Sequence, residues 1–389
     1  MIRRVWFQEF RALRDVDLTL EPLTVIVGAN SSRKTSILSG IEAVLDAARV
    51  ATGAMLRDRW AQDRTRAASA ASPTVFGVEF ADRDPPDQFE VRLRQPTATE
   101  ELRFRPFGYA SSIRARFEGQ EQRSDEQPGG AFLSNFGERF RAFAETFPTA
   151  HVLRMEAPRL ASAAYSTAEV PRLGADGEGL ASVIADIATR SPELLDAIVT
   201  SVRNVVPAVR RIRAVRAAVE RAEQEVIEVS GQTVSFTRAR TYWGHRVVVD
   251  MLNGTEISLQ NAGEGTALAI GLMTYVHTMS AAGMLLVDDV DRGLHPKAQQ
   301  DLVRVLRALM RERPGLQVVA TTHSPFVLNE LSYAEVRLTT LDDRGATLVG
   351  SLTEHPDYPR WKDHVQPGEL WTSGLEEWLK RRKSPEVAA

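Results

Sequence analysis

The chain has 389 residues, a net charge of -3, 43% hydrophobic and 25% charged residues, and no cysteine. This balance is typical of a soluble globular protein with roughly two domain-sized units. The lack of cysteine excludes disulfides, thiolate zinc sites and cysteine nucleophiles, and it predicts a cytoplasmic location. We expect neither a signal peptide nor a membrane span, since no apolar run approaches ~18 residues. Any contact with nucleic acid would need a local basic patch.

The first elements lead into a loop. Residues 2–7 and 16–20 alternate between apolar and polar side chains, which predicts two strands. Residues 23–27 are a short β-branched apolar run, which predicts a strand buried on both faces. Gly28 ends that run, and apolar residues then recur at helical spacing over 36–48. The sequence does not decide whether this helix continues to about residue 70.

A strand, a tight turn and a helix form the setting of a phosphate-binding loop, in which backbone N–H groups and a lysine converge on anionic oxygens. Gly28, Lys34 and Thr35 match the pattern G-x-x-x-x-G-K-[ST], but Arg33 replaces its second glycine. Because a helix start mostly has ordinary backbone angles, we expect an L-residue to be tolerated at position 33. A plain strand-to-helix turn is the alternative interpretation.

The middle of the chain mixes strands and helices. Strands are expected at 74–80, 89–93, within 102–117 and at 151–155, and helices at 132–147 and, broken at Ser191–Pro192, over 180–206. Residues 118–130 are expected to be a mobile surface loop. Residues 209–226 are rich in arginine (Arg210, Arg211, Arg213, Arg216 and Arg221). They could contact a phosphate backbone, or form a solvated face balanced by nearby glutamates.

The last third returns to a predicted core. Strands are expected at 234–236, 247–250, 284–287 and 317–320, with a hairpin over 337–340 and 346–350, and disorder from about Arg381. The segment NAGEG opens a predicted helix that runs through Met279. A helix over 297–313 separates two buried strands, so it predicts a βαβ unit and a parallel sheet.

Polar residues follow both of those buried strands. Asp288 and Asp289 end the first strand, and His323 comes just after the second. The carboxyl ends of parallel strands are where α/β sheets bind ligands. Asp288 suits a magnesium ligand, Asp289 suits orienting or deprotonating a water, and His323 could contact a γ-phosphate or that water. Structural roles remain the alternative for all three residues.

The motifs together resemble those of ABC-type ATPases of the soluble RecF-, SMC- and OLD-related branch, which includes phage-defence ATPases. The segments GANSSRKT, NAGEG, LLVDDVDRGLHP and TTHS occur in the family's order of P-loop, signature, Walker B with D-loop, and switch histidine. The resemblance covers residues 1–50 and about 245–330. It implies an α/β P-loop NTPase, an ABC ATPase head with a mixed sheet and an inserted, mainly helical lobe.

The resemblance also implies a set of site residues and cofactors. ATP and Mg²⁺ would be the cofactors, with Thr35 and Asp288 as metal ligands and Asp289 and His323 as catalytic residues. The nucleotide would contact Gly28, Asn30, Arg33, Lys34, Thr35, Ser36, Gly263 and Gly265. Asp289 is one methylene shorter than the family's glutamate, and a misplacement of ~1 Å can cost ~100-fold in rate. Together with Arg33, it predicts slow hydrolysis.

The implied function is ATP hydrolysis with ATP-dependent closure of a homodimer that drives a separate effector in a DNA-related or anti-phage process. The alternative is a nucleotide-sensing scaffold that binds ATP but scarcely hydrolyses it. Nucleic-acid binding stays open, and no membrane contact is expected. The expected domains are an N-terminal head part (1–80), an inserted lobe of strands and then helices (81–230), a C-terminal head part (231–352) and a tail (353–389).

Overall fold

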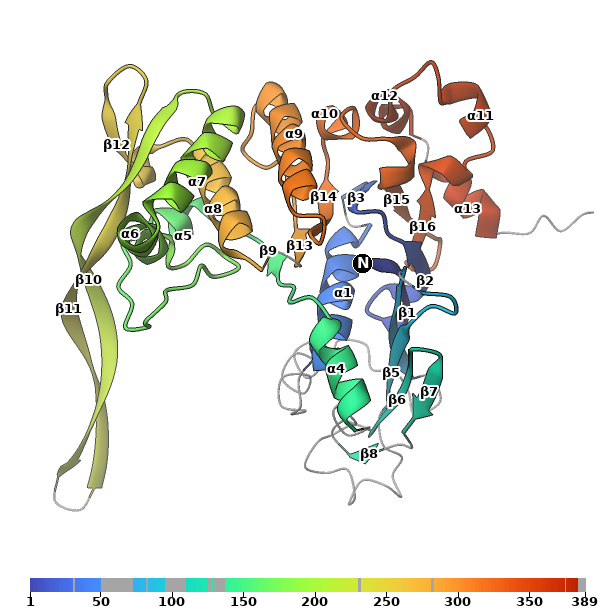
Figure 1. The fold of residues 1–389 in the computed structure, drawn as a ribbon, viewed down its shortest axis with the longest axis horizontal. Coiled ribbons are helices and arrows are strands. Elements are labelled where there is room, and N and C mark those ends of the chain that lie inside the picture. The colour runs from blue at the N-terminus through green and yellow to red at the C-terminus, as the bar shows by residue number, and fades with distance from the viewer. Residues whose placement is uncertain are drawn as a thin grey trace, which may run out of the picture. The chain divides into compact units, whose positions relative to one another are not determined.

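The computed structural model describes residues 1–30, 32–49, 73–81, 83–94, 110–124, 127–128, 137–229, 232–280, 283–374 and 376–383. The chain divides into two compact units, which are coloured along the sequence in Figure 1. Unit 1 comprises Met1–Val152, Ser280–Asp291 and Leu306–Ala389, and unit 2 comprises Leu153–Met279 and Arg292–Val305. Each unit is described by itself.

A six-stranded, mostly parallel sheet carries the motifs of unit 1. Its order is β16-β15-β3-β14-β13-β9. The strands are β3 (Leu23–Gly28), β9 (Val152–Leu153), β13 (Met284–Val287), β14 (Gln317–Thr322), β15 (Val336–Leu341) and β16 (Thr347–Ser351). β3 pairs in parallel with β14 and with β15, while β16 runs antiparallel to β15. Every residue of β3, β13 and β14 is buried, which explains their continuous apolar runs.

A seven-stranded antiparallel sheet forms the second layer of unit 1. It contains β1 (Ile2–Phe10), β2 (Leu13–Thr19), β4 (Thr74–Phe80), β5 (Gln88–Arg94), β6 (Ala110–Phe117), β7 (Gln120–Arg123) and β8 (Gln127–Pro128). Side chains from this sheet, from α1 (Lys34–Arg49) and from α4 (Glu138–Thr146) share one hydrophobic core. Edge-to-face phenylalanine pairs hold α4 in place, with ring centroids 5.7 Å apart for Phe80 and Phe143 and 5.0 Å apart for Phe80 and Phe147.

Short elements complete unit 1 after the parallel sheet. They are α10 (Pro325–Leu328), η4 (Tyr333–Glu335), η5 (Leu352–Glu354), α11 (Tyr358–Trp361), α12 (Pro367–Thr372) and α13 (Glu377–Lys383). The longer helix α9 (Pro296–Glu312) begins in unit 2 and ends in unit 1. Within the part of the chain that the structure describes, no helix combines the length and apolar character needed to cross a membrane.

Unit 2 combines helices with a long β-ribbon. Its helices are α5 (Ala157–Ala161), α6 (Leu180–Arg190), α7 (Pro192–Val205), η3 (Leu259–Asn261) and α8 (Glu264–Thr278). Strands β10 (Val209–Val229) and β11 (Gln232–Met251) pair along their whole length, and β12 (Glu256–Ser258) pairs with the end of β11. Figure 1 shows the ribbon extending far past the helices of this unit.

The expected fold class is confirmed, and most expected elements are present. The helix break at Ser191–Pro192 lies between α6 and α7, and the expected strand at 284–287 is β13. The expected helix extension to residue 70, residues 132–136 of the expected helix, and the first strand expected within 102–117 lie outside the described residues.

Several expectations about single segments were wrong. Residues 118–130 are not only a loop, because β7 and β8 pair there with β6. The expected strands at 234–236 and 247–250 are parts of the single strand β11, and the strand expected at 151–155 is shorter. The chain is still helical at Arg381–Lys383, where α13 packs Leu379 into the protein.

Gln317 joins the two sheets of unit 1. Its buried side chain accepts a hydrogen bond from the Ile2 N–H (3.1 Å) and donates to the carbonyls of Ile2 (2.7 Å) and Glu21 (3.2 Å). Because buried backbone groups need hydrogen-bond partners, the pairing fixes the start of β1 against β14.

We therefore expect Gln317→Met to lower the free energy of unfolding by about 2–3 kcal/mol, since buried polar groups would lose their partners. Urea denaturation of the native chain and the variant measures this difference. The matched control is Gln120→Met on the exposed strand β7, expected within about 0.5 kcal/mol of the native chain. Equal effects at the two positions would contradict this role for Gln317.

Candidate nucleotide-binding site

The centre of the parallel sheet positions the predicted loop. β3 lies between β14 and β15, so its carboxyl end meets theirs at one edge of the sheet. Gly28 occupies the last position of β3, opposite Thr339 of β15. A Cβ atom on Gly28 would lie 2.2 Å from the Thr339 carbonyl oxygen, so only glycine fits there. Ser32 in the loop is buried, and its hydroxyl lies 2.8 Å from the Thr339 hydroxyl. The loop is therefore held against β15 before any ligand binds.

Arg33 has a backbone angle that side chains rarely adopt. Its φ is +65°, in the left-handed region, so the expectation of ordinary backbone angles was wrong. The carbonyl of Arg33 accepts a hydrogen bond from the Ser36 N–H (2.9 Å), and this turn opens α1. The backbone at position 33 thus has the left-handed conformation that favours the glycine of the P-loop pattern. The side chain at this position is an exposed arginine.

Lys34 bends back over the loop. Its Nζ donates to the carbonyls of Gly28 (2.9 Å) and Ala29 (3.3 Å), and its side chain is buried. Burial lowers the pKa of the Lys34 ammonium, while the carboxylates of Asp289, Asp288 and Asp291 act to raise it. An ammonium group that is partly desolvated inside a loop of backbone groups is arranged to meet an anion.

Asp288 links three elements at this edge. One of its carboxylate oxygens accepts a hydrogen bond from the Thr35 hydroxyl (2.8 Å) in the first turn of α1. The other accepts from the Thr321 hydroxyl in β14 (2.7 Å). The same Thr321 hydroxyl accepts from the Asp289 N–H (2.8 Å). Thr321 and Asp288 thereby fix the end of β13 relative to the loop.

The Thr35 hydroxyl and the Asp288 carboxylate are oxygen donors of the kind that magnesium takes. No group of three or more His, Asp or Glu side chains that could hold a metal occurs among the described residues. Magnesium is commonly bound by one or two carboxylates together with substrate phosphates and water, so this donor set fits a metal that arrives with a nucleotide.

Asp289 and His323 face each other across the same edge. The Asp289 Oδ1 lies 3.9 Å from the His323 Nε2, and about half of the Asp289 side chain is exposed (49%). Burial and the neighbouring Asp288 carboxylate raise the pKa of Asp289, while His323 and Lys34 lower it. Asp289 also has a positive φ (+52°), which aspartate tolerates better than most residues. The geometry places a carboxylate of increased basicity beside an imidazole.

Asp291 is a further member of this group that the sequence motifs did not single out. Its Oδ1 accepts hydrogen bonds from the Thr322 hydroxyl (2.6 Å) and from the His323 N–H (3.3 Å). It therefore positions the backbone that carries His323. Two features of the sequence could have indicated this role of Asp291. It lies two residues after Asp289, and two threonines precede His323.

The remaining predicted residues divide between the two units. Ser36 is buried in the first turn of α1, and Asn30 is an exposed residue of the loop. Gly263 and Gly265 belong to unit 2, where they flank the start of α8. Unit 1 therefore brings together Gly28, Lys34, Thr35, Asp288, Asp289 and His323.

Within unit 2, the start of α8 is tightly packed on one side and open on the other. A Cβ atom on Gly265 would lie 2.3 Å from the carbonyl oxygen of Gly293, whose φ is +70°. Arg292 contacts Glu264 (3.1 Å) and donates to the Met155 carbonyl (2.6 Å). A Cβ on Gly263 would meet no atom within 4 Å. The helix start thus presents glycine backbone on an uncrowded side.

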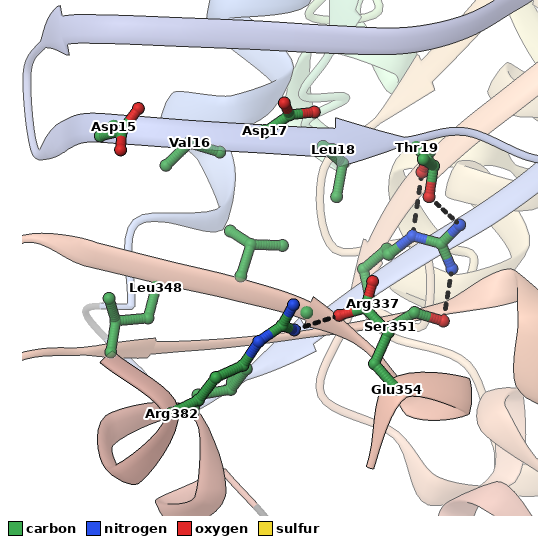
Figure 2. A pocket seen from close by; sticks show the side chains of 13 residues that line it. Asp15, Val16, Asp17, Leu18, Thr19, Arg337, Leu348, Ser351, Glu354 and Arg382 are labelled. Carbon is green, nitrogen blue, oxygen red and sulfur yellow. Dashed lines mark hydrogen bonds and ion pairs between the residues drawn. The ribbon is translucent and has the colours of Figure 1, made fainter. Parts of the chain in front are cut away.

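A cavity of about 440 Å³ lies elsewhere in unit 1, between β2, β16 and α13. Figure 2 shows the guanidinium groups of Arg337 and Arg382 in this cavity bonded to protein groups. Buried Arg337 donates to the Thr19 carbonyl (2.9 Å) and hydroxyl (3.1 Å), and Arg382 pairs with Glu354. Asp17 pairs with Arg4. None of the loop residues lines this cavity, so the sheet edge is the stronger candidate.

The buried strand, the loop with Lys34, and the acids and histidine on neighbouring strands define an ABC/AAA-type P-loop ATPase of the OLD/SMC-like branch. The chain belongs to the family described as "AAA domain, putative AbiEii toxin, Type IV TA system", which matches residues 23–329.

Individual relatives agree with this assignment. The "Retron Vc95 probable ATPase" of Vibrio cholerae serotype O1 biovar El Tor is 30% identical over 98 residues, which are 22% of this chain and 18% of that protein. The "OLD nuclease" of Thermus scotoductus (strain ATCC 700910 / SA-01) is 51% identical over 45 residues, which are 12% of this chain and 8% of that protein. The matches therefore span less than a fifth of each relative.

The fold has a counterpart among solved structures. The crystal structure of the SmcHead bound to the C-winged helix domain of ScpA matches with a TM-score of 0.51 and 13% identity, covering 90% of this chain and 97% of that chain. At this identity the match supports the shared fold.

The left-handed angle at position 33 yields a test. We expect Arg33→Gly to be more stable to urea than Arg33→Ala by about 1 kcal/mol, because an alanine Cβ is strained at positive φ and glycine is not. The control is Ala308, which is exposed in helix α9 and where glycine should be the less stable residue by about 0.5–1 kcal/mol. A more stable alanine at position 33 would contradict the left-handed conformation.

Proposed function

We propose that this ATPase binds ATP with magnesium at the edge of the parallel sheet in unit 1. The observation that carries the proposal is the Asp288 carboxylate, which the Thr35 and Thr321 hydroxyls hold beside the loop that contains Lys34. These groups supply a positive charge and oxygen donors at one place, where a nucleotide's phosphates and their metal need them.

Each side chain has a role that its present contacts suggest. Lys34 exchanges its two loop carbonyls for β- and γ-phosphate oxygens, and the Gly28, Asn30, Arg33 and Ser36 positions surround the phosphates. Thr35 and Asp288 would hold magnesium, which would neutralise phosphate charge. The hydrogen bond between Thr35 and Asp288 keeps these two oxygen donors 2.8 Å apart.

Hydrolysis is assigned to Asp289 and His323. A water between them can donate a proton to the Asp289 carboxylate, whose raised pKa makes it a better base. His323 orients that water or the γ-phosphate, and Asp291 holds the His323 backbone in position. We expect turnover to be slow, because Asp289 is short and Arg33 keeps a strained loop.

The second half of each site comes from another copy. The open backbone at Gly263, followed by the closely packed Gly265, lies at the N-terminus of a 15-residue helix, where N–H groups favour an anion. We propose that these groups meet the nucleotide of a second protomer, so that ATP closes a head-to-tail homodimer. The closed dimer would act on a separate effector protein in the cytoplasm, in a DNA-related or anti-phage process, as the retron-associated and OLD relatives suggest.

The domain division expected from sequence stays a proposal: head parts over 1–80 and 231–352, an inserted lobe over 81–230 and a tail over 353–389. Two of its boundaries fall between paired strands, β4 with β5 and β10 with β11. The competing function is a nucleotide-sensing scaffold with little hydrolysis. Its support is the positive φ of both Arg33 and Asp289, since strain at these positions affects turnover more than binding.

We expect Lys34→Ala to weaken ATP binding about 10- to 100-fold, because a hydrogen bond to a charged group contributes about 1.5–3 kcal/mol. Isothermal titration calorimetry with ATP and magnesium measures the affinity. The control is Lys362→Ala, which removes an exposed lysine outside the site. Unchanged affinity in the folded Lys34→Ala chain would contradict the site. Phosphate release from the same native sample separates a hydrolase from a scaffold.

A further inference from the structure

Arg33 has a backbone conformation that its own residue type does not favour. Its φ of +65° lies in the left-handed region, where the Cβ atom crowds the following carbonyl oxygen. Such strain persists where the surrounding structure enforces it. The hydrogen bond from the Ser36 N–H to the Arg33 carbonyl (2.9 Å) fixes the peptide plane after Arg33. The plane before it must be fixed too, because φ and ψ describe how the two planes are rotated about one Cα atom.

The peptide plane before Arg33 contains the Ser32 carbonyl, and Ser32 is held at three points. Its N–H donates to the Ala29 carbonyl (3.1 Å). Its hydroxyl lies 2.8 Å from the Thr339 hydroxyl of β15. Its carbonyl oxygen has a longer contact, of 3.5 Å, with the Thr347 hydroxyl of β16. Ser32, Thr339 and Thr347 are all buried, where polar groups need such partners.

The hydroxyl groups of Ser32 and Thr339 form a chain with one direction. The Thr339 hydroxyl donates to the Val27 carbonyl (3.2 Å) in β3. Because a hydroxyl has one proton and can also accept, we assign the Ser32 hydroxyl as the donor to Thr339. One threonine therefore connects the loop to the strand that precedes it and to the neighbouring strand β15.

The same pair of hydroxyls accounts for the space beside the first glycine of the loop. A Cβ atom on Gly28 would lie 2.3 Å from the Thr339 Oγ1 and 2.9 Å from the Ser32 Oγ. The hydroxyls thus occupy the place where a side chain would lie. Gly28, Ser32 and Thr339 are packed as one unit, so a shift of the hydroxyl pair is transmitted to the loop.

We propose that Ser32 and Thr339 are positioning residues that hold the phosphate loop in its left-handed turn. The P-loop pattern has a glycine at position 33, for which this turn is unstrained. Here the residue is an arginine, and the turn depends on contacts instead. The hydroxyl pair fixes the peptide before Arg33, and the Ser36 bond fixes the peptide after it.

The consequence for a nucleotide is geometric, and this part of the inference rests on the proposed function. Lys34 follows Arg33 directly, and its Nζ donates to the Gly28 carbonyl (2.9 Å). A change of φ at Arg33 turns the loop N–H groups relative to the first turn of α1, where an anion would bind. Loss of the hydroxyl pair should weaken phosphate binding, although it removes neither a charge nor a backbone donor.

The first test needs no nucleotide. Arg33→Gly and Arg33→Ala are compared by urea denaturation of the full chain, with Thr339 intact and with Thr339→Val. With Thr339 intact, glycine should be the more stable residue at position 33, because alanine is strained at positive φ. With Thr339→Val the turn relaxes, and glycine should lose this advantage because it loses more conformational freedom on folding.

The matched control is Thr340→Val, the same substitution at the next residue of β15, whose side chain points to the other face of that strand. In this background glycine should keep its advantage at position 33. If Thr339→Val does not fold, Ser32→Ala removes the same hydrogen bond from the loop side and replaces it in the comparison. An advantage of glycine that is equal with and without the hydroxyl pair would overturn the inference.

Calorimetry with ATP and magnesium then tests the role in binding. Thr339→Val should weaken ATP binding about tenfold, in line with the strain of a left-handed L-residue. Thr339→Ser, which keeps the hydroxyl, and Thr340→Val should stay within about threefold of the native affinity. Adding Arg33→Gly to Thr339→Val should recover most of the loss, because glycine has no strain to release.

These outcomes separate a positioning role from a general loss of stability. A loss of affinity that Arg33→Gly does not reduce, or an equal loss with Thr340→Val, would exclude the positioning role. A native chain that binds no ATP would contradict the proposed function, whereas the urea comparison would still decide whether the hydroxyl pair enforces the turn.

Discussion

The structure depends on one carboxylate at the edge of the parallel sheet. Asp288 receives a hydrogen bond from Thr35 at the start of α1 and another from Thr321 in β14. Asp288 is half-buried, and a carboxylate that loses part of its water is stabilised when its oxygens are paired, as these two bonds pair them. They also fix the distance between the loop that follows β3 and the loop that follows β13. The geometry that we propose for nucleotide binding is therefore held by contacts within the protein itself.

Two positions of backbone strain lie at this edge. Of the five described non-glycine residues with positive φ, Arg33 and Asp289 both belong to the site. Such conformations cost of order 1–3 kcal/mol and persist where the surroundings enforce them. For Asp289 the enforcing contact is the bond from its N–H to Thr321. For Arg33 it is the turn that starts α1.

The sequence indicated the core strands and the common sheet edge of the proposed site residues for a simple reason. Buried strands such as β3 and β13 appear as short apolar runs, and parallel strands bring the residues after them to one edge. Asp291 was missed because its contribution is a pair of hydrogen bonds to Thr322 and His323, which no motif encodes. The ribbon was missed because alanine, arginine and glutamate dominate β10, and strand preference depends on pairing more than on such residues. The left-handed backbone angle of Arg33 was also missed, because it is set by the surrounding turn and not by the residue type.

The most direct test of this account is the magnesium dependence of ATP affinity, measured by calorimetry for the native chain and for Asp288→Asn. If Asp288 is held ready for a metal that arrives with ATP, magnesium should strengthen binding to the native chain at least tenfold, or ~1.4 kcal/mol. The asparagine variant, which keeps an acceptor for Thr35 or Thr321 but lacks the charge, should lose most of that gain. Equal magnesium dependence in both chains would contradict the account.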